Sequence, residues 1–167
     1  MKALIVYESA WGNTRAVAEA LAAGLEDSAT TEVVDVEWAP ALAGLEVDLL
    51  VVGAPTHAFG LSRAGTRQDA HRRGGAQLST GVREWLDAAT TASLRVATFD
   101  THVRHPNLPG SAARKAAKRL TRAGCTVVTE PTSFWVDDYE GPLLPGELDR
   151  AREWGSMLAA HLTPSPS

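Results

Sequence analysis

The sequence contains a single cysteine, Cys125, among its 167 residues. One thiol excludes a disulfide within the chain and any zinc or iron–sulfur site that is built on several cysteines. A phosphatase-type cysteine nucleophile would need an arginine six residues further on, and Pro131 stands there. We therefore expect Cys125 to be a small apolar residue that opens a buried strand.

Long hydrophobic runs are also missing. The longest, residues 3–7 and 49–54, are far shorter than the roughly 20 residues that a membrane span needs. No secretory signal pattern follows the first methionine, so we expect a cytoplasmic protein without a membrane partner. Hydrophobic residues make up 44% and charged residues 22%, which excludes a disordered or collagen-like chain. We expect one domain over residues 1–162 and a disordered Pro/Ser tail over 163–167.

Positive charge is absent from a long stretch, because residues 16–62 contain acidic side chains but no Lys or Arg. The net charge of -4 gives no general attraction to nucleic acid, so no nucleic-acid partner is expected. Basic residues gather instead at 63–73 and 104–122. The histidines lack the spacing of paired metal ligands, and no carboxylate cluster accompanies them, so no metal site is predicted.

Apolar residues follow two alternating patterns along the chain. Short continuous runs are typical of strands that are buried on both faces of a parallel sheet. They occupy residues 2–7, 31–36, 47–53, 94–99 and 125–128, with room for a resumption at 134–136 after Pro131. Amphipathic segments between them predict helices at 14–25, 82–89, 111–123 and 145–161. The alternation predicts a doubly wound, five-stranded α/β domain with helices on both faces of the sheet.

In such a sheet, ligands bind beyond the carboxyl ends of the strands. The loop after the first strand, residues 8–14, has hydroxyl groups at both ends and Gly-Asn between them. It could present several backbone N–H groups to one small anion, such as a phosphate monoester, at a helix N-terminus. An ordinary helix cap at Asn13 or Ser9 is the alternative. The glycine motifs of dinucleotide and nucleotide-triphosphate folds are absent.

The segment that follows the third predicted strand, residues 54–80, is long for a connection inside a compact domain. We expect it to be a loop that binds a ligand or a partner. Its start, from Gly53 to Gly60, offers backbone polar groups and the planar side chains of His57 and Phe59 to a flat heteroaromatic ligand. The alternatives are that Phe59 packs under its own loop and that His57 is merely solvated.

These loops resemble those of the flavodoxin family, whose first loop reads roughly Ser/Thr-x-Thr-Gly-x-Thr around the phosphate of flavin mononucleotide (FMN). Ser9, Gly12, Asn13 and Thr14 match this pattern, and Trp11 stands where the family usually has a second threonine. Residues 53–60 resemble the second flavin loop. Residues 99–102 correspond to the third loop, where His102 is the nearest planar residue to the usual stacked Tyr or Trp.

The resemblance extends over essentially the whole chain, looks like the short-chain subgroup and implies the strand order 2-1-3-4-5. It also implies that FMN is bound noncovalently and that no side chain acts as acid, base or nucleophile. The implied cofactor-binding residues are Ser9, Ala10, Trp11, Gly12, Asn13, Thr14, Pro55, Thr56, His57, Phe59, Gly60, Asp100, Thr101 and His102.

The resemblance favours an electron carrier, monomeric or weakly dimeric, that exchanges electrons with an unidentified reductase or acceptor protein. Two alternatives stay open. One is an FMN-dependent NAD(P)H oxidoreductase of the quinone-reductase type, and the other is a flavodoxin-like module that has lost its cofactor.

The two basic clusters are interpreted first as solvated surface. For the cluster of Arg63, Arg67, Arg72 and Arg73 beside the second flavin loop, the alternatives are contact with an acidic partner, a nucleotide phosphate or the flavin.

Overall fold

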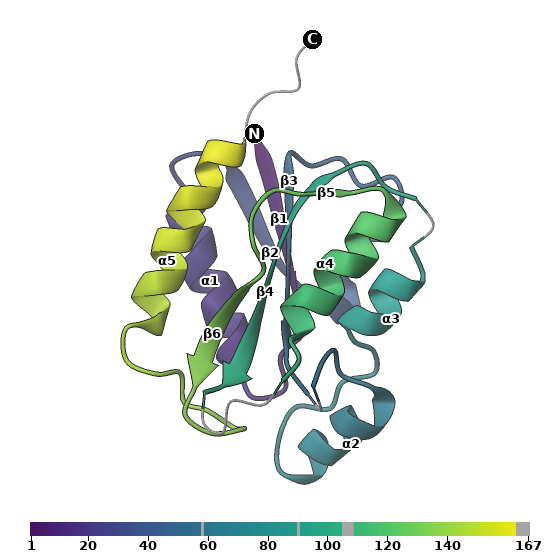
Figure 1. Cartoon of the computed structure of the whole chain (residues 1–167), viewed down its shortest axis with the longest axis vertical. Coiled ribbons are helices and arrows are strands. Elements are labelled where there is room, and N and C mark those ends of the chain that lie inside the picture. Colours follow the sequence, from purple (N-terminus) through teal and green to yellow (C-terminus); the bar gives the residue numbers. More distant parts are fainter. Residues whose placement is uncertain (58, 90, 105–108, 163–167) are drawn as a thin grey trace.

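The computed structural model describes residues 1–57, 59–89, 91–104 and 109–162, which form a central sheet with helices on both sides (Figure 1). The strands are β1 (Lys2–Tyr7), β2 (Thr30–Asp35), β3 (Leu49–Pro55), β4 (Arg95–Val103), β5 (Thr126–Val127) and β6 (Thr132–Val136). The helices are α1 (Asn13–Leu25), α2 (Ala64–Arg72), α3 (Val82–Asp87), α4 (Ala112–Ala123) and α5 (Glu147–Leu158). Two short 3₁₀ helices follow β2 and α5, at Val36–Trp38 and Ala159–His161.

The sheet has the predicted order, β2-β1-β3-β4-β5, and these neighbouring strands are parallel. The fifth strand of the sheet differs from the prediction, because two separate segments, β5 and β6, pair with β4 in its place. β5 pairs with the beginning of β4, and β6 pairs with its end, up to Val103 opposite Val136. Pro131, which has no backbone N–H to donate, lies in the break between them. The resumption expected at 134–136 is therefore confirmed and begins at Thr132.

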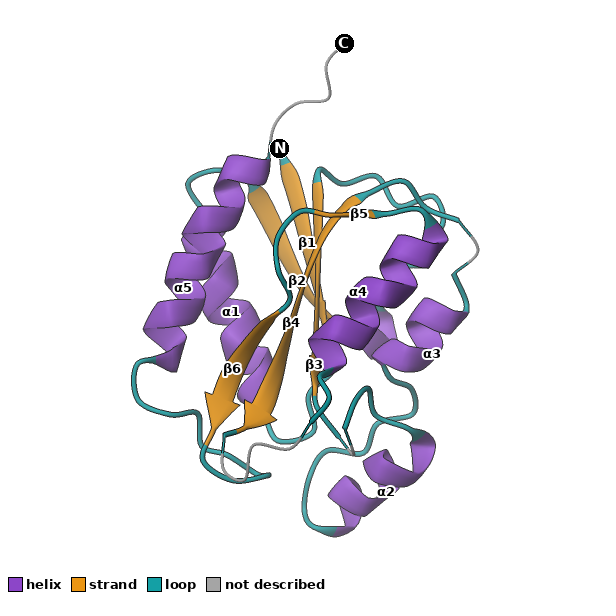
Figure 2. Cartoon of the chain, in the orientation of Figure 1, coloured by secondary structure: helices purple, strands orange, loops and turns teal. Residues whose placement is uncertain are grey.

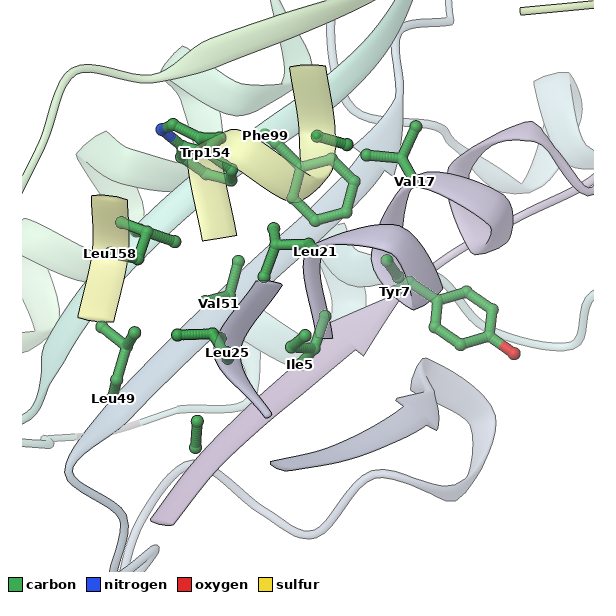
Figure 3. Close-up of a cluster of buried hydrophobic side chains, with 14 of the residues drawn as sticks. Ile5, Tyr7, Val17, Leu21, Leu25, Leu49, Val51, Phe99, Trp154 and Leu158 are labelled. Carbon is green, nitrogen blue, oxygen red and sulfur yellow. The ribbon is translucent and has the colours of Figure 1, made fainter. Parts of the chain in front are cut away.

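Alternate residues of each strand enter two separate cores, one on each face of the sheet. In β1, Ile5 and Tyr7 enter the core beneath α1 and α5, while Leu4 and Val6 enter the core beneath α3 and α4 (Figure 2). Figure 3 shows the first of these cores, in which side chains of the two helices meet those of the sheet. Both faces of the sheet are thus covered, as its continuous apolar strands require.

Two predicted boundaries are wrong in ways that affect the site. The segment 54–80 is not one long loop, because it contains α2, whose first turn is capped by a hydrogen bond from the Arg63 backbone N–H to the Thr66 hydroxyl, 2.9 Å. β4 continues to Val103 and not to Phe99, because β3 pairs with it as far as Thr101 and β6 as far as Val103. Residues 100–102 therefore lie in a strand and not in a loop.

The last helix also departs from its prediction. It begins at Glu147, after Gly146 in the left-handed region (φ 85°), so Pro145 precedes the helix and is not part of its first turn. Leu148, expected on the buried face, is exposed. The predicted tail at 163–167 lies outside the described residues. Among the described residues, no helix has both the length and the apolar character needed to cross a membrane.

Candidate functional site

A pocket lies at the carboxyl ends of the strands, at the lower edge of the sheet in Figure 1. The loop after β1 contributes Ser9, Ala10, Trp11, Asn13 and Thr14. The end of β3 and the turn after it contribute Pro55, Thr56 and His57. The ends of β4 and β6 and the segment after β6 complete the lining with Thr101, Val103, Val136 and Tyr139. The structure thus brings together predicted site residues from the segments that follow the first and third strands and from the end of the fourth strand.

The loop after β1 has the geometry of an anion cradle. Gly12, in the left-handed region at φ 92°, precedes α1, and no side chain caps this helix. The Gly12 backbone N–H donates to the Ser9 hydroxyl oxygen (3.0 Å), which leaves the Ser9 O–H free to donate. The first N–H groups of α1 have no acceptor within the helix, and the helix dipole favours an anion at this end. The loop therefore offers neutral hydrogen-bond donors, and its predicted role as a phosphate site stays a prediction.

Thr14 ties this loop to the sheet. Its buried hydroxyl forms a hydrogen bond of 2.8 Å with that of Thr101 on β4. Asn13 makes a second tie, because its side-chain amide donates to the Glu140 carbonyl oxygen (3.1 Å) in the segment after β6. The cradle is consequently held from two sides. Arg15, the nearest base in the sequence, pairs at the surface with Glu19 (3.0 Å).

His57 is buried, so the alternative of a solvated histidine is wrong. Burial, together with the positive charge of Arg67, lowers the pKa of His57 to about 4, and the imidazole is therefore neutral at pH 7. Its Nδ1 atom has no hydrogen-bond partner among the described residues, and the same holds for Trp11 Nε1. Both residues line the pocket. A ligand here could satisfy two buried polar atoms that the protein does not.

Phe59 and Gly60 form the turn after His57 but do not line the pocket. The backbones of His57 and Gly60 exchange two hydrogen bonds, of 2.8 and 3.0 Å, which closes the turn. Phe59 sits at its tip with φ 73°, a rare conformation for a residue with a side chain, and 51% of its surface is exposed. Phe59 does not pack under its own loop, so that alternative is also wrong. Its predicted contact with a flavin ring stays a prediction.

Asp100 and His102 are not brought to the pocket, which corrects the interpretation of 99–102 as a third flavin loop. Because residues alternate along β4, Thr101 and Val103 face the pocket while Asp100 and His102 point to the opposite side. The Asp100 carboxylate accepts hydrogen bonds from the Ser111 hydroxyl and the Ala113 backbone N–H at the start of α4. His102 lies against Trp135, with 5.6 Å between ring centroids.

Tyr139, in the segment after β6, is a pocket residue that the sequence analysis missed. Its ring lies 5.2 Å from that of His57, centroid to centroid, and its burial raises the pKa of its hydroxyl. The Arg73 guanidinium lies over the Tyr139 ring, 5.7 Å from its centroid. No motif marks Tyr139 in the sequence. Its place shortly after the last strand is the available signal, since the carboxyl ends of all strands of a parallel sheet lie at one edge, where ligands bind.

Arg67 corrects the interpretation of its cluster as solvated surface, because only 5% of its surface is exposed. Its guanidinium donates to the Ser62 hydroxyl (2.9 Å) and to Glu84 (2.7 Å). Ser62 in turn donates to the buried carboxylate of Glu8 (2.6 Å), whose pKa is raised by burial. This chain of contacts anchors α2 to the end of β1. Arg63, Arg72 and Arg73 are exposed, as expected.

The fold and the pocket define an α/β protein whose strand ends combine an anion cradle with buried ring side chains. A family model described as Flavodoxin matches residues 5–156. Because this match spans most of the sequence, the chain belongs to the flavodoxin family, a family of electron-transfer flavoproteins that typically bind FMN.

Solved flavodoxins have a similar fold. Oxidised flavodoxin 1 from Bacillus cereus has a TM-score of 0.71 and 19% identity, covering 98% of this chain and 100% of that chain. A flavodoxin from the domain Archaea has a TM-score of 0.69 and 19% identity, covering 97% and 99%. A short-chain flavodoxin associated with a non-canonical PDU bacterial microcompartment has a TM-score of 0.71 and 13% identity, covering 98% and 99%. A search of curated proteins gives no match.

The residues present fit the phosphate end of FMN. The cradle supplies neutral donors, and none of the described residues that line the pocket carries a carboxylate. The pocket as a whole is narrow in this structure, with a free volume of about 20 Å³, and two of its lining rings, His57 and Tyr139, lie against each other. A cavity of this size holds about one water molecule. Binding of FMN here therefore requires lining side chains to move.

Proposed function

We propose that this protein binds FMN noncovalently in the pocket and acts as an electron carrier in the cytoplasm, with a separate protein as its redox partner. The observation that carries the proposal is the combination of an anion cradle with two unpartnered polar atoms, Trp11 Nε1 and His57 Nδ1, in one pocket. Leaving a buried donor or acceptor unpaired costs about 1–3 kcal/mol. A ligand that pairs with these atoms while its phosphate occupies the cradle recovers that free energy.

The residues around the pocket bind and orient the cofactor. The Ser9 hydroxyl and the N-terminus of α1 hold the phosphate, and the bond between Thr14 and Thr101 fixes the cradle against the sheet. Trp11 and His57 offer polar ring atoms, and Tyr139 offers a planar face to the ring end of the pocket. The flavin itself supplies the redox chemistry when it is bound.

The proposal is tested first by the absorption spectrum of the freshly purified protein. We expect the visible absorption of a bound flavin, and one equivalent of FMN should be released on denaturation. Protein that purifies colourless and does not bind added FMN would support the alternative of a module that has lost its cofactor.

The cradle is tested by the double variant Ser9→Ala, Thr14→Val, which removes the Ser9 hydroxyl that can donate to the phosphate and the Thr14 hydroxyl that holds the cradle against Thr101. A charge-assisted hydrogen bond contributes about 1.5–3 kcal/mol, so affinity for FMN should fall by roughly one order of magnitude or more. Riboflavin, which lacks the phosphate, should lose little affinity in the same calorimetric titration. Thr121→Val on α4, where the hydroxyl donates to the Ala117 carbonyl oxygen, is the matched control and should change neither value. Equal losses for both ligands would place the phosphate elsewhere.

A further inference from the structure

Phe59 stands out from the protein surface at the tip of the turn between β3 and α2. The turn lies beside the candidate cofactor pocket, because His57, which lines that pocket, exchanges two backbone hydrogen bonds with Gly60. Phe59 has a φ of 73°, and 51% of its surface is exposed. A backbone conformation of this kind persists where the surrounding structure fixes it, and it is often part of a functional site. Aromatic residues are also enriched at protein interfaces.

Neighbouring elements hold this turn in place. Gly110, just before α4, lies so close to the Phe59 backbone that a Cβ atom on Gly110 would collide with the Phe59 carbonyl oxygen. The Arg83 guanidinium on α3 donates to the carbonyl oxygens of Leu61 (2.7 Å) and Ser62 (3.1 Å), which directly follow the turn. The exposed aromatic ring is therefore carried by a segment that is fixed from two sides.

Basic side chains surround the turn. Lys115 on α4 lies along Gly60, because a Cβ atom on Gly60 would be 2.7 Å from Lys115 Cδ and 2.9 Å from its Nζ. Arg63 immediately precedes α2 and is exposed. The pKa of Arg83 is lowered by burial and further by the positive charges of Arg119 and Arg63, so these guanidinium groups are close enough to repel one another. The Phe59 surface, as we call it, consists of Phe59, Arg63, Arg83, Lys115 and Arg119.

Acidic side chains balance only part of this charge. Asp87 pairs with Arg119 at 3.2 Å. Within residues 1–57, 59–89, 91–104 and 109–162, neither Arg63 nor Lys115 forms an ion pair. The segment after β6 has exposed acids, within residues 137–140, and is not part of this surface. A protein of net charge -4 thus presents a local positive surface around Phe59.

We propose that the Phe59 surface docks the redox partner protein, and that this partner presents carboxylates around an apolar site that receives the Phe59 ring. The inference rests on the proposed function, because an electron carrier must bring its partner beside the cofactor pocket. Opposite charges orient the encounter of two proteins, and a central aromatic side chain supplies affinity. The partner therefore has an acidic docking face, although this chain is itself acidic overall.

The probes for the experiment are cytochrome c, which has a basic surface, and cytochrome c whose lysines have been succinylated, which has an acidic one. Both carry the same haem and differ in surface charge. Calorimetry with the protein as purified measures their binding whether or not flavin is present. We expect the succinylated form to bind, and its affinity to fall as salt is added. If the net charge of -4 governed the encounter, this probe would be repelled, and salt would weaken the repulsion.

Charge reversal locates the surface. The double variant Arg63→Glu, Lys115→Glu should weaken binding of succinylated cytochrome c by roughly tenfold or more at about 0.1 M salt, because attraction to carboxylates becomes repulsion. Binding of untreated cytochrome c should not weaken. The matched control is Lys118→Glu, Arg122→Glu, which makes the same change in net charge at exposed positions in the second half of α4. It should change either affinity by less than about threefold.

The aromatic contact is tested by Phe59→Ala. This variant should weaken binding of succinylated cytochrome c by roughly fivefold or more, because a central aromatic anchor is lost. The loss should be the same at every salt concentration, since salt screens charges and not apolar contacts. An unchanged affinity would overturn the assignment of Phe59 to the interface.

Electron transfer gives a second readout in the FMN-loaded protein. After chemical reduction of the flavin, each ferric haem of the succinylated probe takes one electron from it and becomes ferrous. Stopped-flow absorption follows this step. The rate at low probe concentration should fall in Arg63→Glu, Lys115→Glu by about the same factor as the affinity, and it should change little in the control. A rate that does not follow the affinity would place the docking site elsewhere.

The binding measurements decide the proposal independently of the flavin. Failure of succinylated cytochrome c to bind, or binding that strengthens as salt is added, would overturn it. Equal losses in the two double variants would show a response to overall charge and would also overturn it. Protein that binds no FMN but binds the acidic probe through Arg63 and Lys115 would support the docking surface and contradict the proposed function.

Discussion

His57 and Glu8 are two buried titratable residues near the candidate cofactor site, and their neutral forms are favoured by the same physical cause. Burial lowers the pKa of His57 and raises that of Glu8. Arg67 acts on both, since its positive charge lowers the pKa of His57 further and opposes the rise at Glu8. A neutral histidine that contacts the pocket can both donate and accept a hydrogen bond, which a charged one cannot.

The state of His57 predicts how stability depends on pH. Between pH 6.5 and about 4 the unfolded chain binds a proton at His57 that the folded protein does not bind, so stability falls as the pH falls through this window. The full loss is about 3 kcal/mol, at about 1.4 kcal/mol per pK unit. Urea unfolding at several pH values should show a shallower fall in the His57→Gln variant than in the unmodified protein.

Glu8 also changes its pKa on folding, so the pH dependence of the unmodified protein has to be compared with that of the His57→Gln variant. Its pKa is raised in the folded protein, so its contribution to stability is present at low pH and is lost as the pH rises, opposite to that of His57. Subtracting the two proteins' free energies of unfolding at each pH removes the Glu8 contribution. If the difference does not change between pH 7 and pH 4, His57 is not held neutral by the fold.

At the scale of elements, the contact between α2 and the end of β1 leaves no room for a side chain at residue 81. A Cβ atom on Gly81 would collide with the Glu8 carboxylate and would lie 3.0 Å from the Ser62 hydroxyl. Gly81→Ala should therefore destabilise the protein by about 1–3 kcal/mol in urea unfolding. Gly65→Ala, on an open side of α2, is the matched control and should stabilise it by up to about 1 kcal/mol. A neutral result at Gly81 would mean that the anchor of α2 is loose.

The segment after β6 supplies Tyr139, whose proposed role is to contact the ring end of the ligand. Tyr139→Ala should lower the affinities for FMN and riboflavin by a similar factor, because aromatic stacking contributes about 0.5–1.5 kcal/mol and does not involve the phosphate. Titration by quenching of flavin fluorescence measures both affinities. A gain in affinity in this variant would show instead that Tyr139 covers His57 and competes with the ligand.

The sequence predicts those elements whose burial follows from apolar periodicity, such as β1 and α1. It misses α2, because this helix buries Ala70 and the guanidinium of Arg67 in place of an apolar stripe. It places the end of β4 too early, since Asp100, Thr101 and His102 are polar residues that are buried in the sheet. That error carried Asp100 and His102 into the predicted site, and only the pairing with β3 and β6 corrects it.

At the scale of the whole molecule, positive charge is distributed unevenly along the chain. The stretch 16–62, which has no base, forms β2, β3 and most of α1, whereas arginines cluster on and beside α2 and on α4. The candidate cofactor pocket takes Pro55, Thr56 and His57 from the stretch without bases, and Arg73 lies over the ring of Tyr139, another lining residue. The arginine side should favour any ligand or cofactor state that carries more negative charge.

This distribution predicts the direction in which Arg73 shifts the reduction potential of a bound flavin. Reduction adds negative charge to the ligand, so a nearby guanidinium stabilises the reduced state, and Arg73→Gln should lower the potential. Two charges about 10 Å apart at an effective dielectric constant of about 20–80 correspond to a shift of tens of millivolts, and Asp69, 3.4 Å from Arg73, reduces it. Because Arg73 is exposed, the shift should shrink as salt is added.

A redox titration of the FMN-loaded protein measures the shift, and Arg122→Gln should leave the potential unchanged. A potential that rises in Arg73→Gln, or that moves equally in both variants, would mean that Arg73 does not act locally on the flavin.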